Sequence, residues 1–66
     1  MIFAQNLKEI RKFLGISQTE LAKRCGLEPC AISHFECGQR EPNIKNLLKL
    51  ANGLGVTTDR LLKEPA

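Results

Sequence analysis

The sequence predicts an all-α fold, a compact bundle of five short helices that forms a single domain over residues 1–66. Three observations carry this prediction. The chain has only 66 residues, Gly and Pro divide it into short segments, and apolar residues recur within those segments at helical spacing. Because the chain has no Trp or Tyr and only three Phe, aliphatic side chains must fill the core.

The first helix is predicted over residues 3–14. Its apolar positions follow offsets of 0, 4, 7 and 11, which place them on one face: Phe3, Leu7, Ile10 and Leu14. Gly15 follows directly, in the position after a helix where a left-handed residue is favoured. We therefore expect this face to be buried and the helix to end at Gly15.

A capping box predicts where the second helix starts. The Ser17 side chain can accept a hydrogen bond from the backbone of Glu20, and the Glu20 side chain can reach back to Ser17. The helix then runs to Cys25 and stops at Gly26. Its inward positions are Leu21, Ala22 and Cys25.

The third helix is predicted over residues 29–37. Pro29 suits the first helical position, where its missing N–H would have no partner anyway. Pro29 also moves Glu28 out of the α region, as an N-cap residue requires. Gly38 marks the end of this helix.

Two more helices complete the prediction. Asn43 caps a fourth helix that Gly55 ends, with apolar positions at Ile44, Leu47, Leu48, Ala51 and Leu54. Thr57 caps a short fifth helix that contains Leu61 and Leu62. Connections this short between five helices describe a small bundle.

Residues 17–37 have the dimensions of a DNA-binding helix-turn-helix, with two short helices joined by a tight turn at Gly26. At about 100° per residue, one side of the helix over 29–37 is apolar: Ala31, Ile32 and Phe35. The other side is small and polar: Cys30, Ser33, His34 and Cys37. Side chains this short allow a helix to approach base edges in the major groove, although periodicity alone favours a simple solvated face over a DNA-contacting one.

Several motifs point to a known family in combination. They are Ile10-Arg11, the run 16–22, Gly26-Leu27, Ile32-Ser33, Glu36, the run 38–42, the run 47–51 and the run 54–57. Together they resemble the Cro and phage-repressor family, also called XRE-like, from about Leu7 to Leu62. The resemblance implies a lambda-repressor-like DNA-binding domain whose third helix enters the major groove. It also implies a sequence-specific transcriptional regulator, a repressor, that binds near-palindromic double-stranded operators as a homodimer.

The resemblance assigns DNA contacts by position. Three groups of residues are implied: Ser17, Gln18 and Thr19 at the start of the second helix, Pro29, Cys30, Ser33 and His34 as base readers, and Gln39, Arg40 and Asn43 along the backbone. Pro29 departs from the family's usual pattern, because it cannot donate a hydrogen bond. We expect Pro29 and Cys30 to contact a thymine methyl group while Ser33 and His34 supply polar contacts. The acidic Glu28 and Glu41 nearby should cost affinity or discriminate against wrong sites.

The resemblance also implies a structural ion pair and a dimer contact. Arg11 and Glu36 are expected to form a partly buried pair that ties two helices together. Leu61 and Leu62 are candidates for the contact between two copies, and Phe13 is a further candidate because it lies off the core stripe.

Two alternative functions remain open on the same scaffold. One is an antitoxin or another protein-interaction module. The other is a metal- or redox-responsive switch, since Cys30, His34 and Cys37 share one helical face and Cys25 lies nearby across the turn. Cys25 is more simply a small buried apolar residue, so we expect no metal and no cofactor.

Composition and motifs argue against an enzyme. The chain has one His, no suggestive pair of carboxylates and no Gly-rich phosphate loop. A bundle of this size is also expected to lack a hollow of the usual 300–1,000 Å³, so we expect no small-molecule ligand.

Net charge and cysteine use suggest partner and location. The net charge of +3 is compatible with a polyanionic partner. Three cysteines, an odd number, favour a reducing compartment, and no signal peptide or membrane-spanning stretch is evident, so we expect a soluble cytoplasmic protein without a membrane partner.

Overall fold

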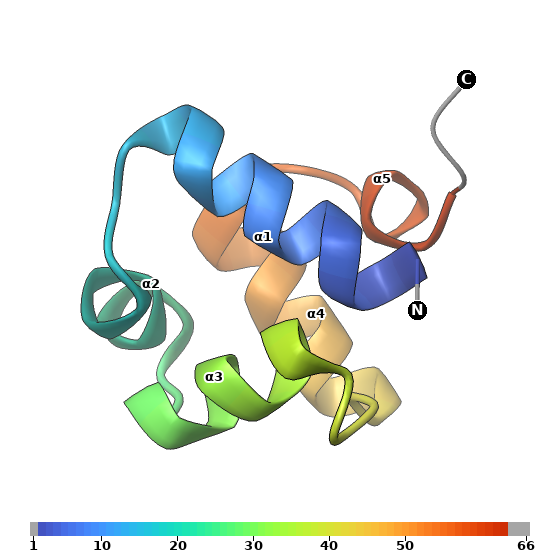
Figure 1. Cartoon of the computed structure of the whole chain (residues 1–66). Helices are drawn as coiled ribbons and strands as arrows, with labels where there is room; N and C mark the ends of the chain where they lie inside the picture. The colour runs from blue at the N-terminus through green and yellow to red at the C-terminus, as the bar shows by residue number, and fades with distance from the viewer. Residues whose placement is uncertain (1, 64–66) are drawn as a thin grey trace.

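Five helices and their connections account for the computed structural model, which describes residues 2–63 (Figure 1). The helices are α1 (Ile2–Leu14), α2 (Gln18–Cys25), α3 (Pro29–Cys37), α4 (Ile44–Leu54) and α5 (Thr58–Leu62). Residues 2–63 contain no strand, so the all-α prediction with five helices is confirmed. None of the helices in this range has the length and apolar character needed to cross a membrane.

The helix starts follow the side-chain caps expected from the sequence. The Ser17 hydroxyl oxygen accepts from the Glu20 backbone N–H at 3.1 Å, and the Asn43 side-chain oxygen accepts from Asn46 at 2.8 Å. The Thr57 hydroxyl oxygen accepts from the Arg60 backbone N–H at 3.2 Å. Each bond satisfies a donor that the first turn of a helix leaves without a partner.

The predicted capping box at α2 is only half formed. Ser17 makes its bond, but the Glu20 carboxylate lies 3.5 Å from the Arg24 Nε one turn along the helix. The predicted return bond from Glu20 to Ser17 is therefore wrong. An i, i+4 pair with Arg24 competes for the same side chain and keeps it on the helix surface.

Glycines end the two helices of the central motif. Gly26 follows α2 with φ 70° and Gly38 follows α3 with φ 77°, both in the left-handed region. An L-residue with a Cβ rarely adopts these values, so the chain reverses here at little cost only because the residue is glycine. These stops fix α2 and α3 at eight and nine residues.

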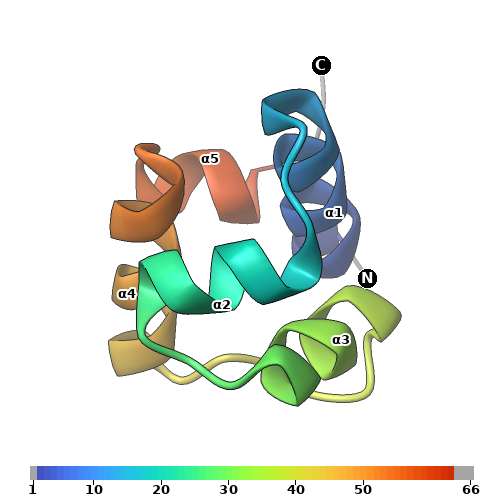
Figure 2. The same ribbon diagram turned by 90° about the vertical axis from the view of Figure 1, so that its left-hand side faces the viewer.

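The helices pack in a ring around one core. The helix α1 packs against α3 and α5, and α2 packs against α3 and α4 (Figure 2). All five helices contribute to the core, which is Phe3, Leu7, Ile10, Leu21, Ala22, Cys25, Ile32, Phe35, Leu50, Ala51, Leu54 and Leu61. The rings of Phe3 and Phe35 meet edge to face, with centroids 6.2 Å apart, and join α1 to α3.

One buried polar side chain fastens the C-terminal end of the bundle. Asn6 is 1% exposed, and its Nδ2 donates to the carbonyl oxygens of Leu61 at 2.9 Å and Lys63 at 2.8 Å. These carbonyls belong to the last turn of α5 and the residue after it, which have no further helical partners. Asn6 therefore ties the first helix to the end of the last one.

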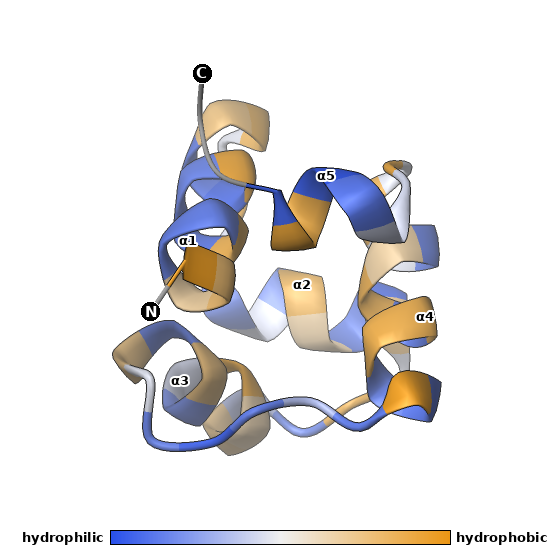
Figure 3. Cartoon of the chain, turned by 90° about the vertical axis from the view of Figure 1, so that its right-hand side faces the viewer, coloured by the Kyte–Doolittle hydropathy of each residue, from blue (hydrophilic) through white to orange (hydrophobic). Residues whose placement is uncertain are grey.

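Three apolar positions predicted to face inward are exposed. Leu14 is 41% exposed, Ile44 77% and Leu48 52%, whereas Leu50, which the predicted stripe of the fourth helix omitted, is fully buried. The buried stripe of α4 follows Leu50, Ala51 and Leu54. The outer side of α4 faces no neighbouring helix (Figure 3), and Leu14 borders an open groove at the end of α1, which explains why these apolar side chains stay partly in solvent.

Candidate nucleic-acid interface

The helix-turn-helix predicted over residues 17–37 is formed by α2 and α3. The two helices pack on each other across the short connection 26–28 (Figure 2). Leu21 and Ile32 are fully buried between them and Ala22 is 1% exposed, so a small residue lies where the helices come close. This packing fixes the direction of α3 relative to α2.

The outer face of α3 is the one predicted for base contacts. Pro29, Cys30 and Cys37 are exposed, and Ser33 and His34 are half-buried. The opposite face carries Ile32 and Phe35 into the core, while Ala31 packs against the core edge. The helix therefore presents short side chains outward on a rigid, well-packed support.

The ion pair predicted between Arg11 and Glu36 is present. The Arg11 Nε and Nη2 donate to the two carboxylate oxygens of Glu36 at 2.6 and 3.0 Å, and Nη1 donates to the Ile16 carbonyl at 2.9 Å. The side chains are 13% and 3% exposed. The hydrogen bond with the Glu36 carboxylate raises the pKa of the Arg11 guanidinium. This bidentate pair joins α1, α3 and the segment before α2.

Gln18 is attached to the same ion pair. Its Nε2 donates to Glu36 Oε1 at 3.1 Å. A side-chain amide has two donor hydrogens and one acceptor oxygen, so this bond leaves a second hydrogen and the oxygen available. The pair thus holds the first residue of α2 in place beside α3, next to exposed Ser17 and Thr19.

The connection from α3 to α4 lies beside α3 along the same side of the bundle (Figure 1). Gln39, Arg40 and Asn43 are all exposed there. The Asn43 oxygen already caps α4, so only its amide hydrogens are available for a further partner. Glu28 and Glu41 are also exposed, and Glu28 makes no capping bond with its side chain, so both carboxylates are accessible as well.

The cysteines have two different environments. Cys25 is buried, as the simpler interpretation of the sequence required, and burial raises the pKa of its thiol. Cys30 and Cys37 are exposed at the two ends of α3. Within residues 2–63, no three His, Cys, Asp or Glu side chains gather so that they could hold a metal ion. The metal hypothesis built on Cys30, His34 and Cys37 therefore gains no geometric support.

The predicted dimer contact needs a correction. Leu61 is fully buried in the core, so its side chain cannot contact a second copy. Leu62 is 53% exposed and borders a shallow hollow of about 340 Å³ together with Pro42 and Leu47. Phe13 is 89% exposed on α1 and does not line this hollow. Adjacent residues on a helix point about 100° apart, so Leu61 packs in the core while Leu62 does not.

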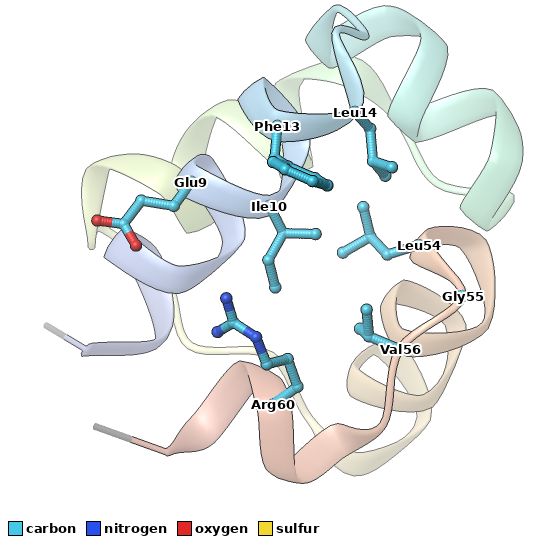
Figure 4. Close-up of a pocket in the computed structure, with 8 residues that line it drawn as sticks. All are labelled: Glu9, Ile10, Phe13, Leu14, Leu54, Gly55, Val56 and Arg60. Carbon is cyan, nitrogen blue, oxygen red and sulfur yellow. The ribbon is translucent and has the colours of Figure 1, made fainter. Parts of the chain in front are cut away.

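The structure also contains a hollow that the sequence did not reveal. A groove of about 550 Å³ lies between the C-terminal half of α1, the connection from α4 to α5, and α5 itself (Figure 4). The expectation that a bundle of this size lacks a hollow in the usual range for ligands is therefore wrong. Phe13, which lies off the core stripe of the first helix, was the sequence signal that pointed to this side of α1.

Comparison with known proteins agrees with this geometry. Residues 7–61 match the helix-turn-helix family. The chain is similar to the SPbeta prophage-derived uncharacterized HTH-type transcriptional regulator YonR of Bacillus subtilis (strain 168), with 42% identity over 62 residues. That alignment covers 94% of this chain and 57% of YonR, so the chain spans little more than half the length of this relative.

Solved structures show the same fold. The crystal structure of the P22 c2 repressor in complex with synthetic operator 9T has 37% identity and a TM-score of 0.90, covering 98% of each chain. The restriction-modification controller C.AhdI from Aeromonas hydrophila has 39% identity and a TM-score of 0.87, covering 89% of each chain. The chain belongs to the helix-turn-helix family of DNA-binding transcriptional regulators.

Proposed function

We propose that this protein binds double-stranded DNA in a sequence-specific way and acts as a transcriptional repressor. The observation that carries the proposal is the geometry of α2 and α3. The helix α3 presents a face of short side chains outward, and the N-terminus of α2, where Gln18 is held by Glu36, lies beside it. A helix N-terminus offers free N–H groups to a phosphate, while an exposed helix of this size fits the major groove.

Base recognition is assigned to the outer face of α3. Ser33 and His34 supply hydrogen-bonding groups, and Pro29 and Cys30 at the first turn supply apolar contact to thymine methyl groups. The operator should accordingly contain thymine opposite the first turn of α3. Glu28 and Glu41 are exposed near the same surface and disfavour close phosphates, which narrows the set of sites that bind well.

Backbone contacts are assigned to residues around α3. They are Ser17, Gln18 and Thr19 at the start of α2, and Gln39, Arg40 and Asn43 in the connection to α4. Such contacts hold the protein in register on the duplex without reading sequence. Of these six residues only Arg40 carries a positive charge, so it should contribute most to the dependence of binding on salt.

We assign the contact of a homodimer to the exposed apolar surface of α4. Ile44 and Leu48 lie one turn apart on α4 and are 77% and 52% exposed, and Leu62 borders the neighbouring hollow beside Pro42. This surface adjoins the connection that carries Arg40, so two copies joined here would place both α3 helices on one side of the dimer. Two half-sites about 34 Å apart, one turn of DNA, would then be bound together.

This role requires no catalysis and places the protein in the compartment that holds DNA, which agrees with the expected cytoplasmic location. We therefore propose a binding protein whose regulatory effect comes from occupying an operator.

The decisive experiment selects binding sites for the purified protein from random duplexes and repeats binding at two salt concentrations. We expect enrichment of a two-fold symmetric site and an affinity that falls steeply as salt rises. Ile44→Asp with Leu48→Asp should leave the fold intact, because both positions are exposed, and should convert the symmetric site into a weakly bound half-site. Binding without any enriched sequence would overturn the proposal.

A further inference from the structure

The groove beside α1 lies on the far side of the bundle from α3 (Figures 2 and 4). Its floor is apolar: Ile10 and Leu54 are each 6% exposed and Val56 is half-buried. Its volume is about 550 Å³. The groove is therefore separate from the surface assigned to DNA and stays accessible when that surface is occupied.

An exposed aromatic side chain stands at the edge of this groove. Phe13 is 89% exposed and Leu14 is 41% exposed, although both line the groove. Single exposed apolar residues are ordinary, but an exposed Phe next to an apolar floor forms a continuous apolar surface. Surfaces of this kind mark interaction sites, because covering them removes apolar area from water.

The two charged side chains of the groove point in different directions. The Arg60 guanidinium points into the groove, and it forms no ion pair or side-chain hydrogen bond with another residue of 2–63 (Figure 4). The Glu9 carboxylate points outward at the opposite edge and accepts from Gln5 Nε2 at 3.5 Å on the outer side of α1. The groove thus holds a positive charge inside and carries a negative charge on its outer edge.

We propose that a second copy of this chain docks in this groove by a two-fold symmetric contact. Phe13 of each copy enters the groove of the other, and Glu9 of each copy pairs with Arg60 of the other. A two-fold contact requires a self-complementary surface, in which every projection and charge finds its counterpart on the same patch. The exposed Phe beside a groove, and the outward acid across the groove from an inward base, meet this requirement together.

The position of the groove predicts what this contact does to bound DNA, and this prediction rests on the proposed function. Two copies joined at this face direct their α3 helices away from each other. The contact therefore joins proteins bound to two separate DNA segments, whereas the α4 surface joins copies on adjacent half-sites. Even a weak contact suffices for bridging on one DNA molecule, because the connecting DNA raises the effective concentration of the second copy.

Charge exchange tests the pairing directly. We would measure self-association without DNA by sedimentation equilibrium, in the Ile44→Asp/Leu48→Asp background that removes the α4 surface. With the groove unaltered, the apparent mass of the protein should rise reversibly with concentration from 7.4 kDa to twice that value. Glu9→Arg alone and Arg60→Glu alone should each weaken association about tenfold through repulsion, and the two together should restore it. Phe13→Ser should abolish it.

The controls separate this contact from folding and from DNA binding. Lys8→Glu reverses an exposed charge on α1 away from the groove and should leave association unchanged. Thermal unfolding should be the same for all variants, since Phe13, Glu9 and Arg60 are exposed. Each groove variant, with the α4 surface intact, should bind a single operator duplex as the original protein does, but only the original protein and the double charge exchange should capture a second duplex.

The possible results distinguish the two proposals. Association that none of the groove variants alters overturns this contact, as does a double charge exchange that fails to restore it. The latter result would indicate a different occupant, such as another protein or an apolar carboxylate. If no duplex is bound by any protein, the proposed function fails, but sedimentation still decides whether the groove mediates self-association.

Discussion

Cys25 Sγ occupies the space that a side chain at Gly53 would need. A Cβ built on Gly53 would clash with this sulfur and would lie 3.3 Å from both the Cys25 Cα and the Arg24 carbonyl carbon. Gly53 is inside α4, where glycine is otherwise unfavourable, and Cys25 is the last residue of α2. The α2–α4 contact therefore depends on a small residue on one helix and a buried thiol on the other.

Gly53→Ala should destabilise the protein by about 1–3 kcal/mol through overpacking, despite the better helix propensity of Ala. Denaturant unfolding measures the change. Cys25→Ala in the same chain removes the sulfur, so the double variant should be more stable than the sum of the single changes implies. Asn52→Ala, at an exposed position of the same helix, is the matched control and should change stability little. Additive effects would contradict the proposed clash.

Arg11→Ala should lower the free energy of unfolding by about 3–5 kcal/mol, because it leaves the Glu36 carboxylate buried without its charge partner. Arg11→Met combined with Glu36→Leu should cost less than Arg11→Ala, since no buried charge remains unpaired. Thermal unfolding monitored by circular dichroism distinguishes these cases. An unchanged melting curve for Arg11→Ala would show that the pair contributes nothing.

Asn6→Ala should destabilise the protein by about 1–3 kcal/mol, because the carbonyls of Leu61 and Lys63 lose their donor. Asn6→Asp should be worse near neutral pH, since a carboxylate would face two carbonyl oxygens without a donor hydrogen. Amide exchange should become faster in α5 before it does so in α2 or α3. Equal stability of the Ala and Asp variants would argue against this donor role.

Ser33→Ala and Arg40→Ala should affect DNA binding in different ways. If Ser33 contacts a base, Ser33→Ala should lose about 1–3 kcal/mol of binding free energy on certain DNA sequences only, and the preference at one operator position should relax. A phosphate contact predicts a nearly uniform loss for Arg40→Ala, with the salt slope reduced by about one. Titration of the selected operator and of single-base variants at several salt concentrations measures both. A uniform loss for Ser33→Ala together with a sequence-dependent loss for Arg40→Ala would mean that the two roles are assigned wrongly.

The three thiols should react at very different rates in the native protein. Burial shields Cys25 and raises its pKa, so less of it is thiolate at a given pH, whereas Cys30 and Cys37 are exposed. Mass spectrometry after brief alkylation should find two modified cysteines, and three after unfolding. Operator DNA should slow modification of Cys30, because the first turn of α3 is then covered. Unprotected Cys30 would contradict its place at the interface.

The sequence by itself determined the helices and their order. Ser17, Asn43 and Thr57 cap the starts of α2, α4 and α5 through their own side chains, and Gly26 and Gly38 end α2 and α3 by adopting left-handed backbone angles. These effects are local, because each depends on residues within one turn. The helix-turn-helix over residues 17–37 followed from the same signals.

Only the tertiary structure decided which apolar faces are covered. Periodicity placed Leu61 and Leu62 together on one short helix, but packing against α1 buries the first and leaves the second in solvent. The buried role of Asn6 depends on carbonyls more than 50 residues away, and the groove beside Phe13 exists only where three elements meet. A periodic pattern defines the faces of one helix, but burial depends on which other helices lie against them, and that is a property of the whole chain.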